Sequence, residues 1–175
     1  MLINLSELFS CQGKMKTYTP DLEMIQCPTP DGVCEIVEKG PISLTIVNEG
    51  DRKMHMEGSV RLSLSMPCSR CLEPVTVPFE LEIDQELDLS QTEEERVEAL
   101  DEQPYISGYN LDVDQLVLNE LLLNLPMKVL CKEDCKGICN RCGTNLNRGT
   151  CDCEKQSLDP RMSVIQDIFK QLKEV

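Results

Sequence analysis

Apolar and polar residues alternate along two neighbouring stretches of the chain. Apolar residues occupy even positions from Met54 to Cys68 and odd positions from Val75 to Leu89. Because successive side chains of a strand point to opposite faces, this period of two predicts two β-strands, each with one buried face and one solvent-exposed face. Apolar residues at positions 42, 44 and 46 predict a third strand just before them.

The two long strands are expected to form an antiparallel hairpin that turns at residues 69–70. Paired residue numbers then add to 139, which sets every apolar even position opposite an apolar odd one, as a shared core face requires. In this register Cys68 lies opposite Cys71, and His55 faces Asp84 in a favourable cross-strand pair. We therefore interpret His55 as a surface residue of the hairpin rather than as a catalytic one.

Helices are predicted after the strands. Residues 116–125 are apolar around most of a helical circumference, which is typical of a helix that is either deeply buried or presented to a partner. Asp112 with Gln115 resembles a capping box at its start, and Pro126 ends it. Asp159-Pro160 then predicts the start of a last, amphipathic helix.

These elements define an α+β fold: an antiparallel β-sheet or partly open barrel, followed by a buried helix, a zinc-ribbon-like segment and a C-terminal helix. We place the main division after residue 110. Residues 1–110 form the β domain and contain an acidic segment at 80–102. Residues 111–175 carry the helix, the cysteine-rich segment at 131–153 and the terminal helix.

Composition limits the type of core, the cellular location and the chemistry of the cysteines. With three Phe, three Tyr and no Trp in 175 residues, the core must be aliphatic. No stretch approaches the ~18–20 apolar residues of a membrane span, and the start lacks the pattern of a signal peptide. We therefore expect a cytoplasmic protein with no membrane partner. Disulfides are rare in the cytosol, and eleven cysteines cannot all pair within one chain, so metal binding is favoured over disulfides.

The negative charge is large and uneven. The formal net charge is −14, which disfavours bulk binding to the phosphate backbone of nucleic acids. Residues 80–102 contain eleven acidic residues against one basic residue. Five of the acids alternate with apolar residues and should line the solvent face of a strand: Glu80, Glu82, Asp84, Glu86 and Asp88. Such a row usually serves solubility, but with the acids that follow it can also attract a basic partner.

Six cysteines fall within residues 131–153: Cys131, Cys135, Cys139, Cys142, Cys151 and Cys153. The unit Cys139-Asn-Arg-Cys142-Gly has the spacing of a metal knuckle, because two intervening residues let both sulfurs reach one ion and the glycine permits the turn. We predict a closed, structural zinc ribbon that includes this pair. The other two ligands stay open among the remaining four cysteines. The Cys151-Asp-Cys153 spacing is tight enough to strain a site that uses both.

Cys68-Ser-Arg-Cys71, at the tip of the predicted hairpin, is a candidate for a second knuckle. Distant cysteines such as Cys27 and Cys34 could complete its metal site. It could instead be a redox pair, although thioredoxin-type motifs lie at helix N-termini rather than between strands. The third interpretation is two buried cysteines that pack as small hydrophobes.

Five segments in this order resemble the YceD family of large ribosomal RNA subunit accumulation proteins. They are Met1–Leu8, Pro67–Pro74, Leu125-Pro126, the cysteine run at 131–153 and Asp159–Arg161. The full cysteine run resembles the Gram-positive type of this family. The resemblance implies a role in accumulation of large-subunit ribosomal RNA, and hence in ribosome biogenesis, and it brings no catalytic residues.

The resemblance and the charge together predict a mechanism without catalysis. We expect the acidic face to bind a basic ribosomal protein or assembly factor, so that contact with ribosomal RNA is indirect or made by the less acidic cysteine segment. Two other classes are open: a cytosolic thiol redox or metal-dependent protein that uses the Cys-x-x-Cys pairs, and a zinc-ribbon transcription accessory factor.

Overall fold

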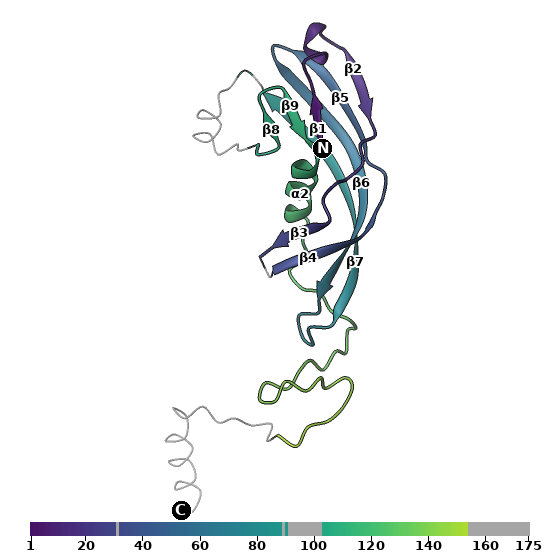
Figure 1. Cartoon of the computed structure of the whole chain (residues 1–175), viewed down its shortest axis with the longest axis vertical. Helices are drawn as coiled ribbons and strands as arrows, with labels where there is room; N and C mark the ends of the chain where they lie inside the picture. Colours follow the sequence, from purple (N-terminus) through teal and green to yellow (C-terminus); the bar gives the residue numbers. More distant parts are fainter. Residues whose placement is uncertain (31, 89, 91–102, 154–175) are drawn as a thin grey trace, which may run out of the picture.

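Six antiparallel strands form the large sheet of the molecule, shown in Figure 1. The computed structural model describes residues 1–30, 32–88, 90 and 103–153. The six strands are β2 (Met15–Tyr18), β3 (Gln26–Thr29), β4 (Gly32–Lys39), β5 (Ser43–Gly50), β6 (Lys53–Pro67) and β7 (Pro74–Asp88). Strand β6 is central: β7 pairs with it along one side, and β5 and β4 pair with successive parts of its other side. The predicted hairpin and the strand before it are confirmed.

A smaller sheet and a short helix cover one face of the large sheet (Figure 1). The three strands of the smaller sheet are β1 (Leu2–Asn4), β8 (Ile106–Ser107) and β9 (Asn110–Asp112). The 3-10 turn η1 (Leu8–Ser10) contacts β5, and helix α2 (Val113–Leu123) contacts β7. The described part of the chain is therefore mostly antiparallel β-sheet with one short α-helix.

An aliphatic core lies between the large sheet and the elements that cover it. Even positions of β6 and odd positions of β7 are buried or half-buried, as the alternation predicted. Burying each large apolar side chain contributes ~1.5–3 kcal/mol, so this layer is the main source of stability. Its most fully buried members include Leu44, Ile46, Met54, Met56, Leu64, Leu81 and Leu87 from the large sheet and Leu111 and Leu116 from the cover.

The predicted register of the long hairpin is wrong by two residues. Lys53 pairs with Asp88 and His55 with Glu86, so paired numbers add to 141 rather than 139, and His55 does not lie opposite Asp84. The turn spans residues 68–73 instead of two residues. In it the Cys68 N–H donates to the carbonyl of residue 73 (2.8 Å), and the N–H of residue 72 donates to the Cys68 carbonyl (2.9 Å). Cys68 is therefore not opposite Cys71. A shift of two preserves the alternation, which is why the buried face was predicted correctly.

Helix α2 begins where the capping pattern indicates. The Asp112 carboxylate accepts hydrogen bonds from the backbone N–H groups of Asp114 and Gln115. The helix buries one face against the core, whereas Leu122 and Leu123 are exposed, so it is not buried all round. The predicted C-terminal helix and residues 89 and 91–102 of the acidic segment lie outside the described residues.

Candidate metal centres

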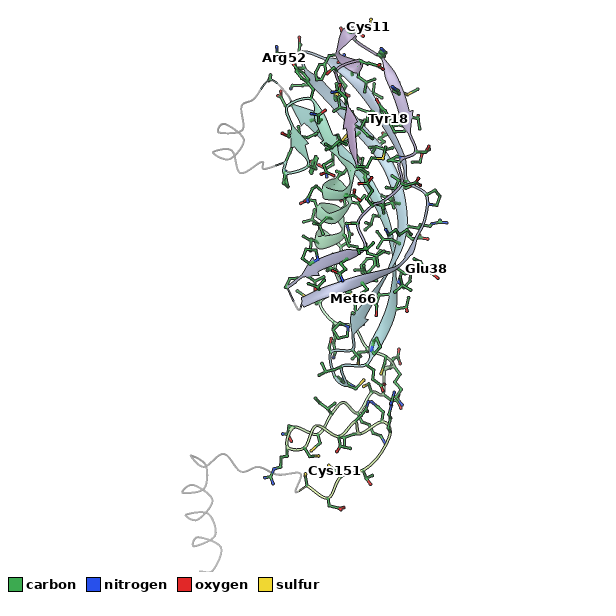
Figure 2. All side chains as sticks on the ribbon, in the orientation of Figure 1. Cys11, Tyr18, Glu38, Arg52, Met66 and Cys151 are labelled. Carbon is green, nitrogen blue, oxygen red and sulfur yellow. The ribbon has the colours of Figure 1, made fainter. Side chains whose placement is uncertain are left out.

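Eight cysteines gather into two groups of four at one end of the large sheet. Figure 2 places Cys151 beyond the hairpin end of the sheet, far from Arg52 and Cys11 at the opposite end. We call residues 129–153 the cysteine lobe. The first group joins Cys68 and Cys71 of the β6–β7 turn to Cys131 and Cys135 of the lobe, and the second group lies wholly within the lobe. Within each group all sulfur atoms lie within 4.8 Å of one another.

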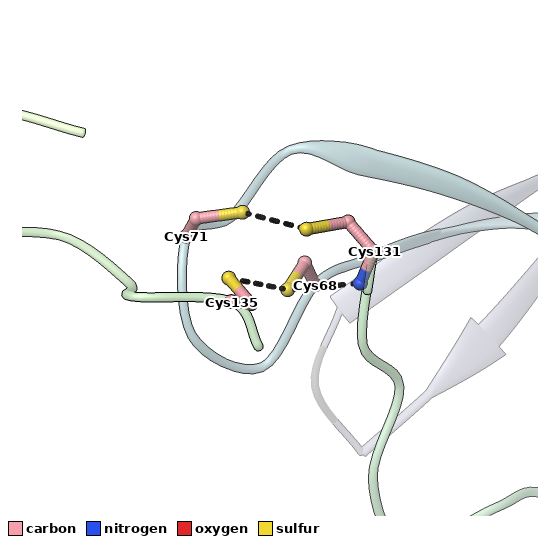
Figure 3. A group of neighbouring side chains, drawn as sticks. All are labelled: Cys68, Cys71, Cys131 and Cys135. Atoms are coloured by element: carbon pink, nitrogen blue, oxygen red, sulfur yellow. Dashed lines mark hydrogen bonds between the residues drawn. The ribbon is translucent and has the colours of Figure 1, made fainter. Parts of the chain in front are cut away.

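The first group has the dimensions of a tetrahedral thiolate site (Figure 3). The Sγ atoms of Cys71 and Cys131 are 3.6 Å apart, and those of Cys68 and Cys135 are 3.9 Å apart. A zinc ion with Zn–S bonds of ~2.3 Å requires sulfur–sulfur edges of about 3.8 Å. A disulfide requires about 2.05 Å, so the spacing fits metal coordination and not a covalent bond.

Backbone hydrogen bonds hold the lobe against the tip of the hairpin. The Ser69 N–H donates to the Val129 carbonyl (2.8 Å), and the Val129 N–H donates to the Ser69 hydroxyl (3.1 Å). The Arg70 guanidinium donates to the Cys135 carbonyl (2.7 Å), and the Arg70 carbonyl accepts from the Ile138 N–H (3.1 Å). These bonds bring two halves of one candidate site together although they are 60 residues apart in sequence.

A glycine is required at the closest approach of lobe and hairpin. Gly137 has φ +77°, and a Cβ atom there would lie 2.9 Å from the Arg70 carbonyl oxygen. Any other residue at Gly137 would combine a strained backbone with a contact that the hairpin backbone must move to relieve.

The second group consists of Cys139, Cys142, Cys151 and Cys153. A tight turn presents its first pair: the Gly143 N–H donates to the Cys139 carbonyl (2.9 Å), and Gly143 has φ +74°. Cys151 and Cys153 join the same group despite the single residue between them, in contrast to the strain expected from that spacing. This group is less enclosed than the first, since Cys142 is exposed and both members of the Cys151–Cys153 pair are half-buried.

Within each group the thiols divide into those that ionise readily and those that keep their protons. Burial opposes ionisation of Cys68, but N–H donors of the hairpin turn and of Cys131 bring the pKa of its thiol to about 6. Burial and neighbouring sulfurs raise the pKa of Cys131 to about 12. In the second group, hydrogen bonds led by the Thr144 hydroxyl bring the pKa of Cys142 to about 6, and Cys142 in turn raises the pKa of Cys153 to about 12. A divalent cation allows all four thiols of a group to ionise, so binding must release protons and weaken as pH falls.

The structure assigns the cysteines whose partners the sequence spacing left undecided. Cys139 and Cys142 lie with Cys151 and Cys153, whereas Cys131 and Cys135 lie with the hairpin pair. Cys27 and Cys34 do not complete the hairpin site. They are buried directly opposite each other on β3 and β4.

Sequence reasoning did not identify the residues that support the thiols. Arg70 docks the lobe on the hairpin, and Asn147 donates its amide to the Cys135 sulfur (3.3 Å). Their place inside or beside a cysteine motif was the one available signal, because hydrogen-bond partners of metal ligands commonly lie there.

The donor sets fit a closed metal site. Each group offers four thiols, which are soft ligands suited to zinc or to iron–sulfur chemistry, and four ligands complete a tetrahedron with no position left for a reacting water. Both groups could therefore hold a metal ion in a structural role.

The acidic side chains of β7 lie on the face of the large sheet that points away from helix α2. Glu80, Glu82, Asp84 and Glu86 are exposed on β7, and Asp88 is half-buried at its end. Cationic neighbours on β6 offset this charge only in part: Arg61 pairs with Glu80 (3.1 Å), and His55 lies 3.6 Å from Asp84. We call Glu80, Glu82, Asp84 and Glu86 the acidic row.

The fold and the two groups together define an antiparallel β-sheet protein with a cysteine-built lobe that could hold two metal ions. Residues 56–170 match the sequence model of the family described as large ribosomal RNA subunit accumulation protein YceD. The chain therefore belongs to the YceD family.

Curated relatives agree with this assignment. The chain is 23% identical to the chloroplastic large ribosomal RNA subunit accumulation protein YCED homolog 1 of Arabidopsis thaliana, a match covering 83% of this chain and 51% of the relative. It is 25% identical to the uncharacterized protein YlbN of Bacillus subtilis, covering 69% of each, and 25% identical to an uncharacterized protein of Mycobacterium leprae, covering 63% and 52%. The match thus spans only about half of the plant relative. The names that describe a role refer to accumulation of the large ribosomal RNA subunit and not to an enzyme. No solved structure matches the chain.

Among the described residues, no helix combines the length and the apolar character needed to cross a membrane.

Proposed function

We propose that this protein is a non-enzymatic ribosome biogenesis factor that supports accumulation of large-subunit ribosomal RNA by binding a basic ribosomal protein or assembly factor in the cytoplasm. The observation that carries the proposal is the acidic row, which lies on one open face of the sheet of a YceD-family chain with a formal charge of −14.

Metal binding would make the protein more negative, which favours a basic protein partner over RNA. Each site of four thiolates around one divalent ion carries two net negative charges, so two filled sites would change the formal charge from −14 to about −18. Residues 129–153 carry four basic and three acidic side chains, a balance of +1, which filled metal sites would make negative. Repulsion from phosphate opposes direct binding to RNA, whereas a lysine- and arginine-rich protein surface is attracted.

The geometry of the row suits a basic partner. Side chains on one face of a strand recur about every 6.8 Å, so the four carboxylates form a line rather than a cluster. Hydroxyl-bearing residues of β5 and β6, among them Thr45 and Ser59, flank this line and leave it accessible. A line of charge of this kind favours rapid association and a marked dependence on salt.

For the cysteine lobe we propose two structural zinc ions. Four thiolates saturate each ion, which supports a structural role over a catalytic one. The same enclosure argues against a redox function for Cys68 and Cys71, which are buried and surrounded by other sulfurs rather than open to a partner thiol. Metal analysis of the purified protein should find about two zinc ions per chain if both sites fill.

The experiment that tests the partner surface is affinity purification of two tagged variants matched in charge. The first, Glu80→Gln/Glu82→Gln/Glu86→Gln, removes three of the four charges of the row. The control, Asp21→Asn/Glu133→Gln/Asp134→Asn, removes the same charge from exposed acids elsewhere.

The row variant should lose bound basic ribosomal proteins or assembly factors and lower the level of large-subunit ribosomal RNA, and the control should retain both. Equal retention by the two variants would show that the row is not the binding surface. Equal loss would show that only total charge matters.

A further inference from the structure

One side chain connects the two candidate metal sites. Asn147 belongs to the loop between Cys142 and Cys151 of the second group, yet its Nδ2 donates to the Cys135 Sγ of the first group (3.3 Å). An N–H donor placed on the sulfur favours the thiolate, which is the form of cysteine that binds metal. A group in one site thus stabilises the metal-binding form of a ligand in the other.

The orientation of the Asn147 amide is fixed by its neighbours. Its Oδ1 accepts the Lys136 N–H (2.9 Å), which leaves Nδ2 as the atom that faces sulfur. Its backbone N–H and its Nδ2 both donate to the Asn145 Oδ1, at 2.9 and 3.0 Å. The donor is therefore aimed at Cys135 by the fold of the loop, and it depends on that fold.

The loop is in turn held by the second site. Cys142 precedes it and Cys151 follows it, so an ion bound to both sulfurs closes the loop that carries Asn147. Apart from the sulfurs, backbone bonds maintain its shape: the Arg148 N–H donates to the Asn145 carbonyl within the loop (3.1 Å), and the Leu146 N–H donates to the Gly137 carbonyl outside it (2.9 Å). An ion at the second site therefore restricts Asn147 to the position from which it reaches Cys135.

We propose that Asn147 couples the two metal sites, so that an ion in the second site raises the affinity of the first. This inference rests on the proposed metal binding. Because coupling between binding sites is reciprocal, an ion in the first site raises the affinity of the second by the same factor. Hydrogen-bond partners of metal ligands contribute ~10–100-fold to metal affinity, which sets the size of the effect.

A second link between the sites is weaker. Arg148 of the same loop forms an ion pair with Glu73 of the hairpin turn, but the Arg148 side chain is 79% exposed. Exposed ion pairs contribute little, so the Asn147 bond should dominate the coupling.

The coupling can be measured by titration with Co²⁺, whose absorption reports tetrahedral thiolate sites. The second site is removed by Cys142→Ser/Cys153→Ser, and the donor is removed by Asn147→Asp, which retains an acceptor for the Lys136 N–H. Asn140→Ala is the control, because Asn140 is an exposed amide of the same lobe. NMR signals of the Arg70 and Ile138 amides identify binding at the first site.

With the second site intact, Asn147→Asp should weaken Co²⁺ binding at the first site by at least ~10-fold, and Asn140→Ala should leave it unchanged. With the second site removed, first-site affinity should already be low, and adding Asn147→Asp should change it little.

Two outcomes would contradict the proposal in different ways. Two bound ions with the same first-site affinity in the wild type and in Asn147→Asp would overturn the coupling and leave the metal proposal standing. Absence of Co²⁺ binding by the wild type would overturn the metal proposal and the coupling with it.

Discussion

The large sheet and the cysteine lobe differ in the source of their stability. The sheet buries a continuous aliphatic core between two layers, whereas the buried aliphatic side chain of the described lobe is Val129. Its other buried side chains are the thiols Cys135 and Cys139. A segment of this size cannot offset its conformational entropy with apolar burial alone, so we expect the proposed metal ions to supply the remaining stabilisation. The two regions should therefore respond to different perturbations.

Metal removal is expected to have the largest effect, and it should be confined to the lobe. Structural zinc contributes an apparent ~10–16 kcal/mol to the folding of small zinc-dependent units. After chelation, hydrogen exchange should show loss of protection for the backbone N–H groups of Cys135, Ile138 and Cys139. The amides of β6 should stay protected. Loss of protection in β6 as well would mean that the two regions fold as one unit.

A cavity in the sheet should produce the converse result. Leu44→Ala removes a fully buried side chain and should lower the free energy of unfolding by ~2–5 kcal/mol. Urea unfolding followed by circular dichroism measures this, and Leu123→Ala, at a position 73% exposed, is the control with little effect. Metal content should be unchanged in both variants. Loss of metal from the folded Leu44→Ala protein would show that the core supports the sites directly.

A substitution at the junction should sharpen the comparison further. Gly137→Ala places a side chain at φ +77° and 2.9 Å from the Arg70 carbonyl oxygen, at a cost of ~1–3 kcal/mol for the backbone conformation. Gly149→Ala is the matched control, because nothing lies within 4 Å of its Cβ position. Only the first variant should release metal faster to a chelator, with the urea midpoint of the sheet unchanged. Equal release rates would mean that the close approach does not hold the lobe.

The smallest effect is a pH dependence that belongs to the sheet alone. A hydrogen bond with Glu57, opposed by partial loss of hydration and aided by Asp84, raises the pKa of His55 above its ordinary value. The stabilisation is therefore complete below about pH 6.5 and is lost as pH rises through the raised pKa. Wild type should exceed His55→Gln in thermal midpoint more at about pH 6 than at about pH 9. An identical difference at both values would contradict this assignment.

Much of the sheet could be predicted because amphipathic strands carry their orientation in their own residues. The register of the hairpin could not, because alternation fixes pairing only to within two residues and the length of the turn decides the rest. Strands β1, β2 and β3 gave little signal because they are only three or four residues long, and β1 obtains its order from a distant partner. Leu2, for example, pairs with Asp112.

The thiols of the candidate sites were visible in the sequence, but their division into groups was not. Cys131 and Cys135 look like members of the run that follows them, and only the docking of the lobe assigns them to Cys68 and Cys71. That docking uses backbone carbonyls and N–H groups, such as the Arg70 carbonyl, which residue identity does not reveal.

The separation of 60 residues between Cys71 and Cys131 also has a consequence in time. A chain is synthesised from its amino terminus at ~5–20 residues per second, so the hairpin thiols precede their partners by roughly 3–12 s. During that interval the hairpin offers only two of the four thiols of the first group. Closure waits for Cys135, after the last strand and helix α2 have been made. A nascent chain that stops before Cys131 would therefore carry Cys68 and Cys71 without the two thiols that complete the first group.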